Sequence, residues 1–192
     1  QFIDPACALL HRRLSVIDPE NGRQPMTIGT HTIAYNGELY NTADLRQELM
    51  EKGVTFATTS DTEVLLQSYL AWGEDCPKKL NGIFAFAIYD QEKRRLFFAR
   101  DPMGVKPLFY ALRDGSFYFA SELKALLCFL EIEPEVDARG LYDLMFLGPG
   151  RTPGFGVFRN VYEVLPGTCG TFDERGLRHS TYWKLRDGEC LD

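Results

Sequence analysis

The sequence predicts an α+β fold, with helices layered on mostly antiparallel sheets. Residues 83–90 are apolar on both faces, so this strand needs cover on both sides and belongs in the middle of a layered structure. Further strand candidates at residues 95–100, 106–111 and 116–121 follow in close succession, with turns between them, as in an antiparallel meander. Strands and helices do not alternate regularly, which argues against a parallel sheet with crossover helices.

Five more strands are expected around this central group. Apolar runs predict strands at residues 6–10 and 54–58, and apolar alternation predicts one at residues 30–35. Two last strands, at residues 161–164 and 169–172, flank a Pro-Gly turn.

Helices are expected over residues 44–52, 64–72, 121–126 and 138–147. Asn41 or Thr42 is suited to cap the first of them, and Asp137 the last. The apolar side chains expected to face the core are Leu45, Leu49 and Met50 in the first helix and Leu141, Leu144 and Met145 in the last.

Composition narrows the class of protein. A chain of 192 residues suits one substantial domain, and its net charge of −6 argues against nucleic-acid binding. No apolar run approaches the length of a membrane span. Five cysteines without paired spacing indicate reduced thiols and a cytoplasmic location. The three histidines lie far apart and away from any cysteine pair, so no metal site is expected.

A polar elbow at residues 35–41, between a strand and a helix, is the first candidate site. Asn36 offers an amide donor for an oxyanion, and Glu38 offers a carboxylate for an ammonium group. Gly37 lets the backbone approach a ligand closely. The alternative is a plain Asn-Gly turn, which these residues alone favour.

Other residues are ambiguous when each is taken separately. Arg13 suits a carboxylate ligand, but taken alone it is favoured as a surface arginine. Asp61 fits the cap of the helix over residues 64–72, a role that Ser60 could also fill, or it could receive a substrate ammonium. His11 and the breaker-rich turn at residues 101–108 are interpreted as structural.

Taken together and in order, these motifs resemble the class II glutamine amidotransferase domain of glutamine-hydrolysing asparagine synthetases. The resemblance runs from about Ala8 to Trp183. The segments that carry it are residues 11–18, 24–26, 35–41, 59–63, 80–90, 100–110, 121–126, 166–167 and 182–183.

The resemblance implies an N-terminal-nucleophile hydrolase fold, a four-layer αββα sandwich. Residues 1–185 would form the amidotransferase domain, and residues 186–192 would begin the linker to a C-terminal synthetase domain. In this family an N-terminal Cys attacks the glutamine carboxamide with its own α-amino group as the base, and the ammonia released amidates aspartate.

The resemblance also assigns roles to residues of this sequence. Arg13 would pair with the α-carboxylate of L-glutamine, and Glu38 and Asp61 would accept its α-ammonium. The side chain of Asn36 and the N–H of Gly37 would form the oxyanion hole. Backbone groups of Leu14, Ser15, Val16 and Ile17 would line the same pocket.

Two features of the family are missing from this sequence. No Cys stands at the N-terminus, and Cys7 is a poor substitute because its amine is locked in a peptide bond. No Gly-Gly pair occurs, so the pyrophosphate loop of the synthetase is absent. The chain looks cut from something longer and is expected not to hydrolyse glutamine as it stands.

The expected partners follow from the same resemblance. No cofactor is expected in this domain, whereas ATP and Mg²⁺ are implied for the synthetase domain, and a homodimer stays open. Two alternatives remain: an amidotransferase domain that serves another ammonia acceptor, or a glutamine-binding module that has lost the nucleophile.

Overall fold

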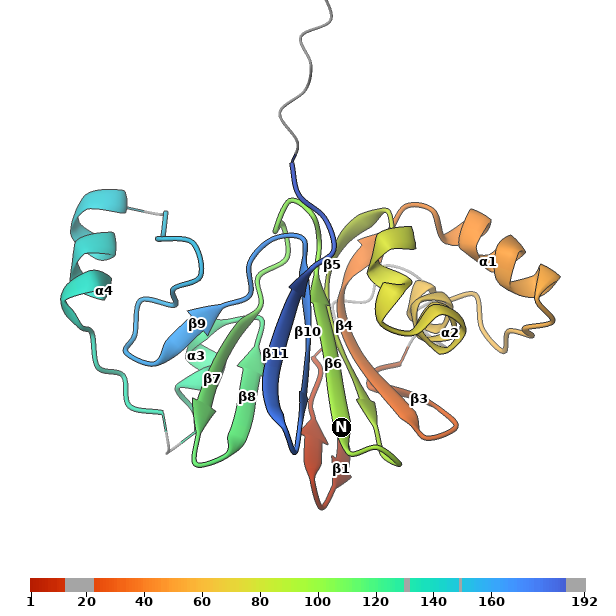
Figure 1. Cartoon of the computed structure of the whole chain (residues 1–192), viewed down its shortest axis with the longest axis horizontal. Helices are drawn as coiled ribbons and strands as arrows, with labels where there is room; N and C mark the ends of the chain where they lie inside the picture. The colour runs from red at the N-terminus through yellow and green to blue at the C-terminus, as the bar shows by residue number, and fades with distance from the viewer. Residues whose placement is uncertain (13–22, 130–131, 149, 186–192) are drawn as a thin grey trace, which may run out of the picture.

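Four layers make up the molecule in a computed structural model that describes residues 1–12, 23–129, 132–148 and 150–185 (Figure 1). Within these residues the larger sheet has the order β11 (Gly176–Thr181), β10 (Thr168–Asp173), β6 (Arg95–Arg100), β5 (Gly82–Asp90), β4 (His31–Leu39) and β3 (Met26–Ile28). The smaller sheet has the order β8 (Ser116–Ala120), β7 (Phe109–Arg113) and β9 (Val161–Glu163), and β1 (Phe2–Asp4) pairs with β2 (Cys7–Leu9). Every one of these pairings is antiparallel, as predicted.

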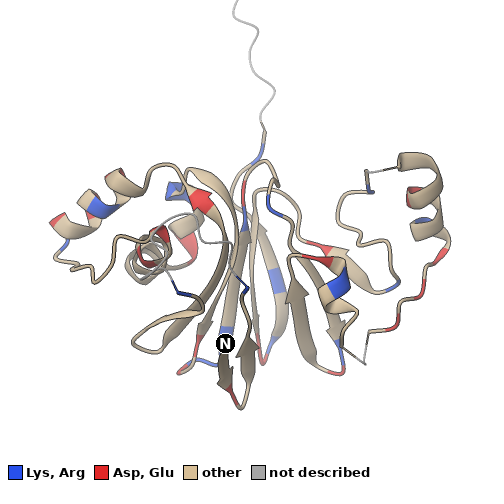
Figure 2. Ribbon diagram, turned by 180° about the vertical axis from the view of Figure 1, so that it is seen from behind, with Lys and Arg blue, Asp and Glu red and all other residues tan. Residues whose placement is uncertain are grey.

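Helices cover the outer faces of the two sheets (Figure 1). Helices α1 (Thr42–Glu51) and α2 (Asp61–Trp72), with the 3₁₀ helix Gly73–Lys79, lie against the larger sheet. Helix α3 (Leu123–Leu126) packs on the smaller sheet, and α4 (Ala138–Tyr142) continues into a π-helical turn, Asp143–Leu147. Figure 2 shows that the charged residues gather mostly on helices, turns and strand ends, which leaves the sheets largely apolar.

Three apolar clusters separate the layers. On β5, Phe84, Phe86 and Ile88 face the helices α1 and α2 in the first cluster. Ala85 and Ala87, on the other face of β5, pack in the second cluster, between the two sheets. The third cluster joins the outer face of the smaller sheet to α3. The two-sided strand is therefore central, as its sequence predicted, and the layers follow the order αββα.

The predicted meander is wrong in one respect, because β6 and β7 belong to different sheets. The turn at residues 101–108 carries the chain from the larger sheet to the smaller one. The carboxylate of Asp101, fully buried, accepts backbone N–H groups of Phe84, Met103, Val105 and Lys106 at 2.9–3.3 Å. This turn is a structural corner, as the sequence suggested, and it forces the change of sheet.

The expected strand at residues 54–58 is absent, and these described residues form a loop. In a sheet, the backbone N–H groups of these residues would donate to a neighbouring strand. Here the side chain of Glu63, in the first turn of α2, accepts hydrogen bonds from two of them. Its carboxylate accepts the backbone N–H of Ala57 at 2.8 Å and that of Thr58 at 2.6 Å. Apolar content alone could not distinguish this loop from a strand.

The elbow expected at residues 35–41 begins later than predicted. Strand β4 runs through Asn36, Gly37 and Glu38 to Leu39 and pairs with β5 along its whole length. The reading of Asn36-Gly37 as a turn is therefore wrong. Asn41 precedes α1, but its side chain bonds the backbone of Lys79 and Asn81 instead of capping the helix.

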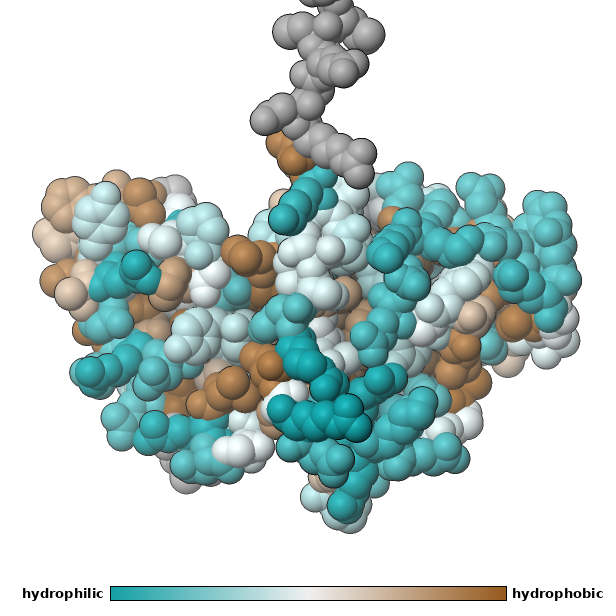
Figure 3. All heavy atoms as spheres, in the orientation of Figure 1, coloured by the Kyte–Doolittle hydropathy of each residue, from teal (hydrophilic) through white to brown (hydrophobic). Residues whose placement is uncertain are grey.

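The predicted core faces of two helices are only partly correct. Leu45 and Leu49 are buried in α1, whereas Met50 is exposed. In α4 and the π-helical turn, the face expected in the core is exposed, and hydrophobic side chains gather there at the upper left of Figure 3. The exposed side chains on this face include Leu141, Tyr142, Leu144, Met145 and Phe146.

In the described part of the chain, none of the helices combines the length and the apolar character needed to cross a membrane.

Candidate functional site

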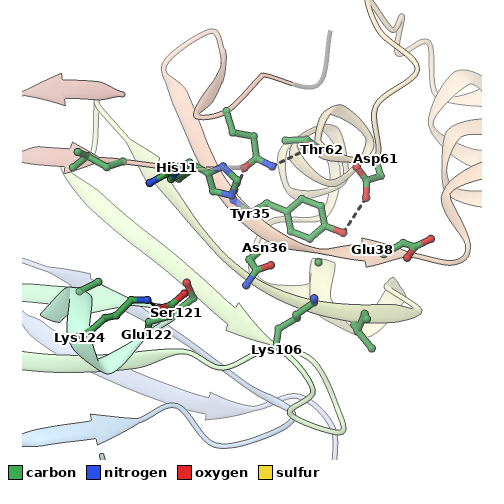
Figure 4. A pocket seen from close by; sticks show the side chains of 16 residues that line it. His11, Tyr35, Asn36, Glu38, Asp61, Thr62, Lys106, Ser121, Glu122 and Lys124 are labelled. Atoms are coloured by element: carbon green, nitrogen blue, oxygen red, sulfur yellow. Dashed lines mark hydrogen bonds and ion pairs between the residues drawn. The ribbon is translucent and has the colours of Figure 1, made fainter. Parts of the chain in front are cut away.

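A pocket of about 710 Å³ lies where the exposed end of β4, the start of α2 and the start of α3 come together (Figure 4). Its lining combines carboxylates, amines and amides with apolar groups, so it suits a small ligand that carries charged and polar groups. The described residues that line it are Leu10, His11, Arg12, Gln24, Tyr35, Asn36, Gly37, Glu38, Asp61, Thr62, Ile83, Lys106, Ser121, Glu122, Lys124 and Ala125.

The pocket lies beside the edge of β4 that continues past the short strand β3. Strand β3 pairs with residues 31–33 of β4, and in the described ranges no strand pairs with this edge beyond Ile33. The backbone N–H of Tyr35 points outward from this edge and donates to Oε1 of Gln24 at 2.6 Å. Backbone groups of a strand repeat every two residues, so the N–H of Gly37 points from the same edge into the pocket. This is the orientation that a backbone oxyanion donor needs.

Only glycine fits at position 37. A Cβ there would collide with the carbonyl oxygen of Ile83 and would lie 2.8 Å from Cα of Phe84. Both atoms belong to the backbone of β5, which cannot move away without breaking the sheet. The fold therefore requires glycine at position 37, whether or not a ligand is bound.

Asp61 faces the pocket instead of capping its helix. Ser60 is the N-cap of α2, and its hydroxyl accepts the backbone N–H of Thr62 at 3.1 Å. Asp61 is the first helical residue, is 5% exposed, and its Oδ2 accepts the hydroxyl of Tyr35 at 3.0 Å. Ser60, the other cap that the sequence offered, therefore caps the helix, and the capping role considered for Asp61 is wrong. Asp61 lines the pocket, and its role toward an ammonium group stays a prediction.

The structure thus brings Asn36, Gly37, Glu38 and Asp61 around one pocket (Figure 4). Their roles toward glutamine stay predictions. Arg13, Leu14, Ser15, Val16 and Ile17, the other predicted ligands, lie outside the described residues.

Sequence reasoning missed the opposite wall of the pocket. Ser121, Glu122 and Lys124 come from the start of α3, where Lys124 pairs with Glu122 at 2.6 Å. Lys106 comes from the corner at residues 101–108 and points into the pocket (Figure 4). All four lie in segments that carry the family resemblance, at residues 100–110 and 121–126, but no local pattern assigns them to the pocket, because the change of sheet at the corner brings them to the site.

An apolar cavity of about 540 Å³ continues from the polar pocket into the space between the sheets. It runs beside β8, which is an edge strand of the smaller sheet, and Leu9 and Phe117 are among its apolar lining residues. This cavity is mostly apolar, in contrast to the charged pocket. Polar groups of a ligand are therefore expected to bind at the edge of β4.

None of the cysteines among the described residues lines the polar pocket. Cys7 lies on β2, and burial, helped by Asp4, raises its pKa to about 12. Burial also raises the pKa values of Cys76 and Cys169. A thiol with a raised pKa is protonated at neutral pH and is a weak nucleophile. In the described ranges no three His, Cys, Asp or Glu residues are grouped to hold a metal ion.

A family model described as a glutamine amidotransferase domain matches residues 1–183. The chain belongs to this family. Asparagine synthetase [glutamine-hydrolyzing] 3 of Bacillus subtilis is 50% identical over 186 residues, covering 95% of this chain and 30% of that protein. A putative asparagine synthetase [glutamine-hydrolyzing] 2 of Methanocaldococcus jannaschii is 32% identical, covering 97% of this chain and 39% of that protein. The amidotransferase domain therefore spans 30% to 39% of the length of these two relatives.

Solved structures confirm the fold of this amidotransferase domain. Glutamine phosphoribosylpyrophosphate amidotransferase from Bacillus subtilis superposes with a TM-score of 0.59 at 25% identity, covering 84% of this chain and 32% of that one. A glutamine aminotransferase class-II domain protein from Silicibacter pomeroyi gives a TM-score of 0.52 at 14% identity, covering 84% of this chain and 71% of that one, and shows the fold alone. The predicted α+β sandwich of the N-terminal-nucleophile type is confirmed.

Proposed function

We propose that this domain hydrolyses L-glutamine to glutamate and ammonia within a glutamine-hydrolysing asparagine synthetase. The observation that carries the proposal is the 50% identity to the Bacillus subtilis enzyme over 95% of this chain. The pocket at the edge of β4 supports it, because it brings together Asn36, Gly37, Glu38 and Asp61.

The charges of the proposed site, with Arg13 added to the described residues, match a zwitterion with a carboxamide side chain. Glu38 and Asp61 receive the α-ammonium, and Arg13 receives the α-carboxylate. The side chain of Asn36 and the N–H of Gly37 donate to the oxygen of the carboxamide as it becomes an oxyanion. A single donor of this kind contributes roughly 2.7–4 kcal/mol to transition-state stabilisation.

The nucleophile in this proposal is an N-terminal Cys of the parent protein, upstream of Gln1. Its α-amino group, with a pKa of about 8, takes the thiol proton as sulfur attacks the carboxamide carbon. That proton leaves with the amide nitrogen as ammonia, and a thioester forms. Water then cleaves the thioester, which releases glutamate and restores the thiol.

The remaining parts belong to the parent protein. Residues 1–185 form the amidotransferase domain, and residues 186–192 lead to a C-terminal synthetase domain. That domain uses ATP and Mg²⁺ to activate aspartate, whereas the amidotransferase domain uses no cofactor. The parent works in the cytoplasm, where glutamine and ATP are both available.

The experiment that tests the proposal measures glutamate release by the parent protein with its native N-terminus and by a variant with the first residue changed to Ala. Glutamate release that depends on the first residue supports the thiol mechanism. ATP-dependent conversion of aspartate to asparagine, driven by glutamine, supports the synthetase assignment.

The same experiment separates the alternatives. Glutamate release without asparagine formation would indicate another ammonia acceptor, as in the structural relative that acts on phosphoribosylpyrophosphate. Glutamine binding without any glutamate release would indicate a non-catalytic binding module.

A further inference from the structure

Tyr35 links the polar residues on β4 to the carboxylate at the start of α2. It lies on β4 directly before Asn36 and Gly37, and its hydroxyl donates to Oδ2 of Asp61 on α2 at 3.0 Å (Figure 4). Its ring packs under Gly37, because Cε2 is 2.7 Å from the position that a Cβ at residue 37 would occupy. Tyr35 and Asp61 are 3% and 5% exposed, so this hydrogen bond is shielded from water.

A second bridge runs beside the first. The side chain of Gln24 accepts the backbone N–H of Tyr35 at 2.6 Å and donates to Oγ1 of Thr62 at 3.3 Å. Both bridges join β4 to the first turn of α2. The open edge of the strand and the carboxylate at the start of the helix are thereby held at a fixed separation.

The hydroxyl of Tyr35 acts as a donor in this pair. Burial, and then the negative charge of Asp61, raise the pKa of Tyr35 far above its usual value. The phenol is therefore protonated at any physiological pH, and an ionised carboxylate is acceptor-only. A charge-assisted hydrogen bond to one oxygen of a buried carboxylate restricts the rotation of that group and so helps to set the direction in which it meets a ligand.

We propose that Tyr35 is a positioning residue that orients the carboxylate of Asp61 toward the α-ammonium group of the bound amino acid. The inference rests on the proposed function, because it takes L-glutamine as the ligand. Tyr35 itself does not touch the reacting carboxamide. Its effect is confined to recognition of the ammonium group.

Because the effect is confined to the ammonium group, the test compares L-glutamine with a ligand that lacks this group. The chain is titrated by calorimetry with L-glutamine and with 5-amino-5-oxopentanoate, which is glutamine without its α-amino group. Tyr35→Phe keeps the ring under Gly37 and removes only the hydroxyl. We expect Tyr35→Phe to weaken L-glutamine binding about tenfold, the loss typical of a hydrogen bond to a charged group, and to leave the deaminated analogue within about twofold.

Tyr89→Phe is the matched control. Tyr89 is also buried, and its hydroxyl also donates to a carboxylate, Oδ1 of Asp4 at 3.1 Å, but it is not among the residues that line the pocket. This variant should change neither affinity.

Each other outcome has a distinct meaning. Equal losses for both ligands in Tyr35→Phe would show a purely structural role and overturn the inference, as would unchanged glutamine affinity. If the unaltered chain binds no glutamine, the glutamine pocket itself fails and the positioning role fails with it.

Discussion

At Gly37 no larger residue can be accommodated without displacing the backbone of the site. Its N–H points from the open edge of β4 into the pocket, while the rest of the residue is enclosed by Tyr35 and by the backbone of β5. We expect Gly37→Ala to lower the free energy of unfolding by about 1–3 kcal/mol, since overpacking forces the backbone to shift. Because the shift displaces the N–H, glutamine affinity should fall as well. Urea unfolding and calorimetric titration measure the two effects.

Gly170→Ala is the control for this prediction. Gly170 lies in β10 of the same sheet, where a Cβ would lie 2.5 Å from the carbonyl oxygen of Arg178 and 2.6 Å from the ring of Phe98. The crowding is similar, but Gly170 does not line the pocket. Comparable losses of stability are expected, with loss of glutamine binding only in Gly37→Ala. Equal loss of binding in both variants would attribute the effect to stability alone.

The sequence identified some residues of the pocket and missed others. Asn36, Glu38 and Asp61 are polar residues at strand and helix ends, and motif order was enough to group them. Lys106 and Glu122 lie in segments that carry the family resemblance, but nothing in the sequence assigned them to the pocket. They reach the pocket only because the corner after β6 turns the chain into the second sheet, which is a long-range consequence of packing.

At the scale of elements, the helix at α4 shows why amphipathic patterning can mislead. Its apolar stripe predicted a core face, but its inner face carries Gly140 and Asp143. Gly140 approaches the backbone of Val157 so closely that a Cβ would collide with it. The carboxylate of Asp143 accepts the N–H and the hydroxyl of Thr152 at 2.9 and 2.6 Å. The close backbone contact of Gly140 and the hydrogen bonds of Asp143 determine which face of the helix is turned inward. Hydrophobic periodicity indicates neither of them.

The loop before α2 offers a test at the same scale. Glu63 replaces a neighbouring strand for residues 57 and 58, since its two oxygens accept three hydrogen bonds. In Glu63→Gln one oxygen becomes an NH₂ group, which cannot accept a backbone N–H. We expect a loss of about 1–3 kcal/mol in the free energy of unfolding and faster amide exchange at Ala57 and Thr58. Hydrogen exchange followed by NMR measures this directly.

Glu92→Gln makes the same chemical change in the exposed turn after β5. It should leave stability within about 0.5 kcal/mol and should not alter exchange at residues 57 and 58. Unchanged exchange in Glu63→Gln would mean that the loop is held by contacts other than this carboxylate.

For the whole molecule, the contact between the two sheets depends on Arg100, at the end of β6. Its guanidinium donates to the carbonyl oxygens of Lys106, Gly104 and Val164 at 2.6–2.8 Å. It also pairs at 3.0 Å with Glu163 of β9, in the smaller sheet. Arg100 is 5% exposed, so each of these bonds is protected from water. The sequence predicted the breaker-rich corner but not this clamp, because its partners are up to 64 residues away.

Arg100→Lys tests whether the shape of the guanidinium, as well as its charge, holds the sheets together. A single ammonium nitrogen cannot reach three carbonyl groups and a carboxylate that surround a planar fork, so buried acceptors are left unpaired. We expect the free energy of unfolding to fall by about 2–4 kcal/mol, measured by urea denaturation. Arg113→Lys, on an exposed side chain whose Nε is 4.0 Å from Asp114, should change it by less than about 0.5 kcal/mol. Equal stability of the two variants would show that positive charge alone suffices at the corner and that apolar packing between the sheets holds the sandwich closed.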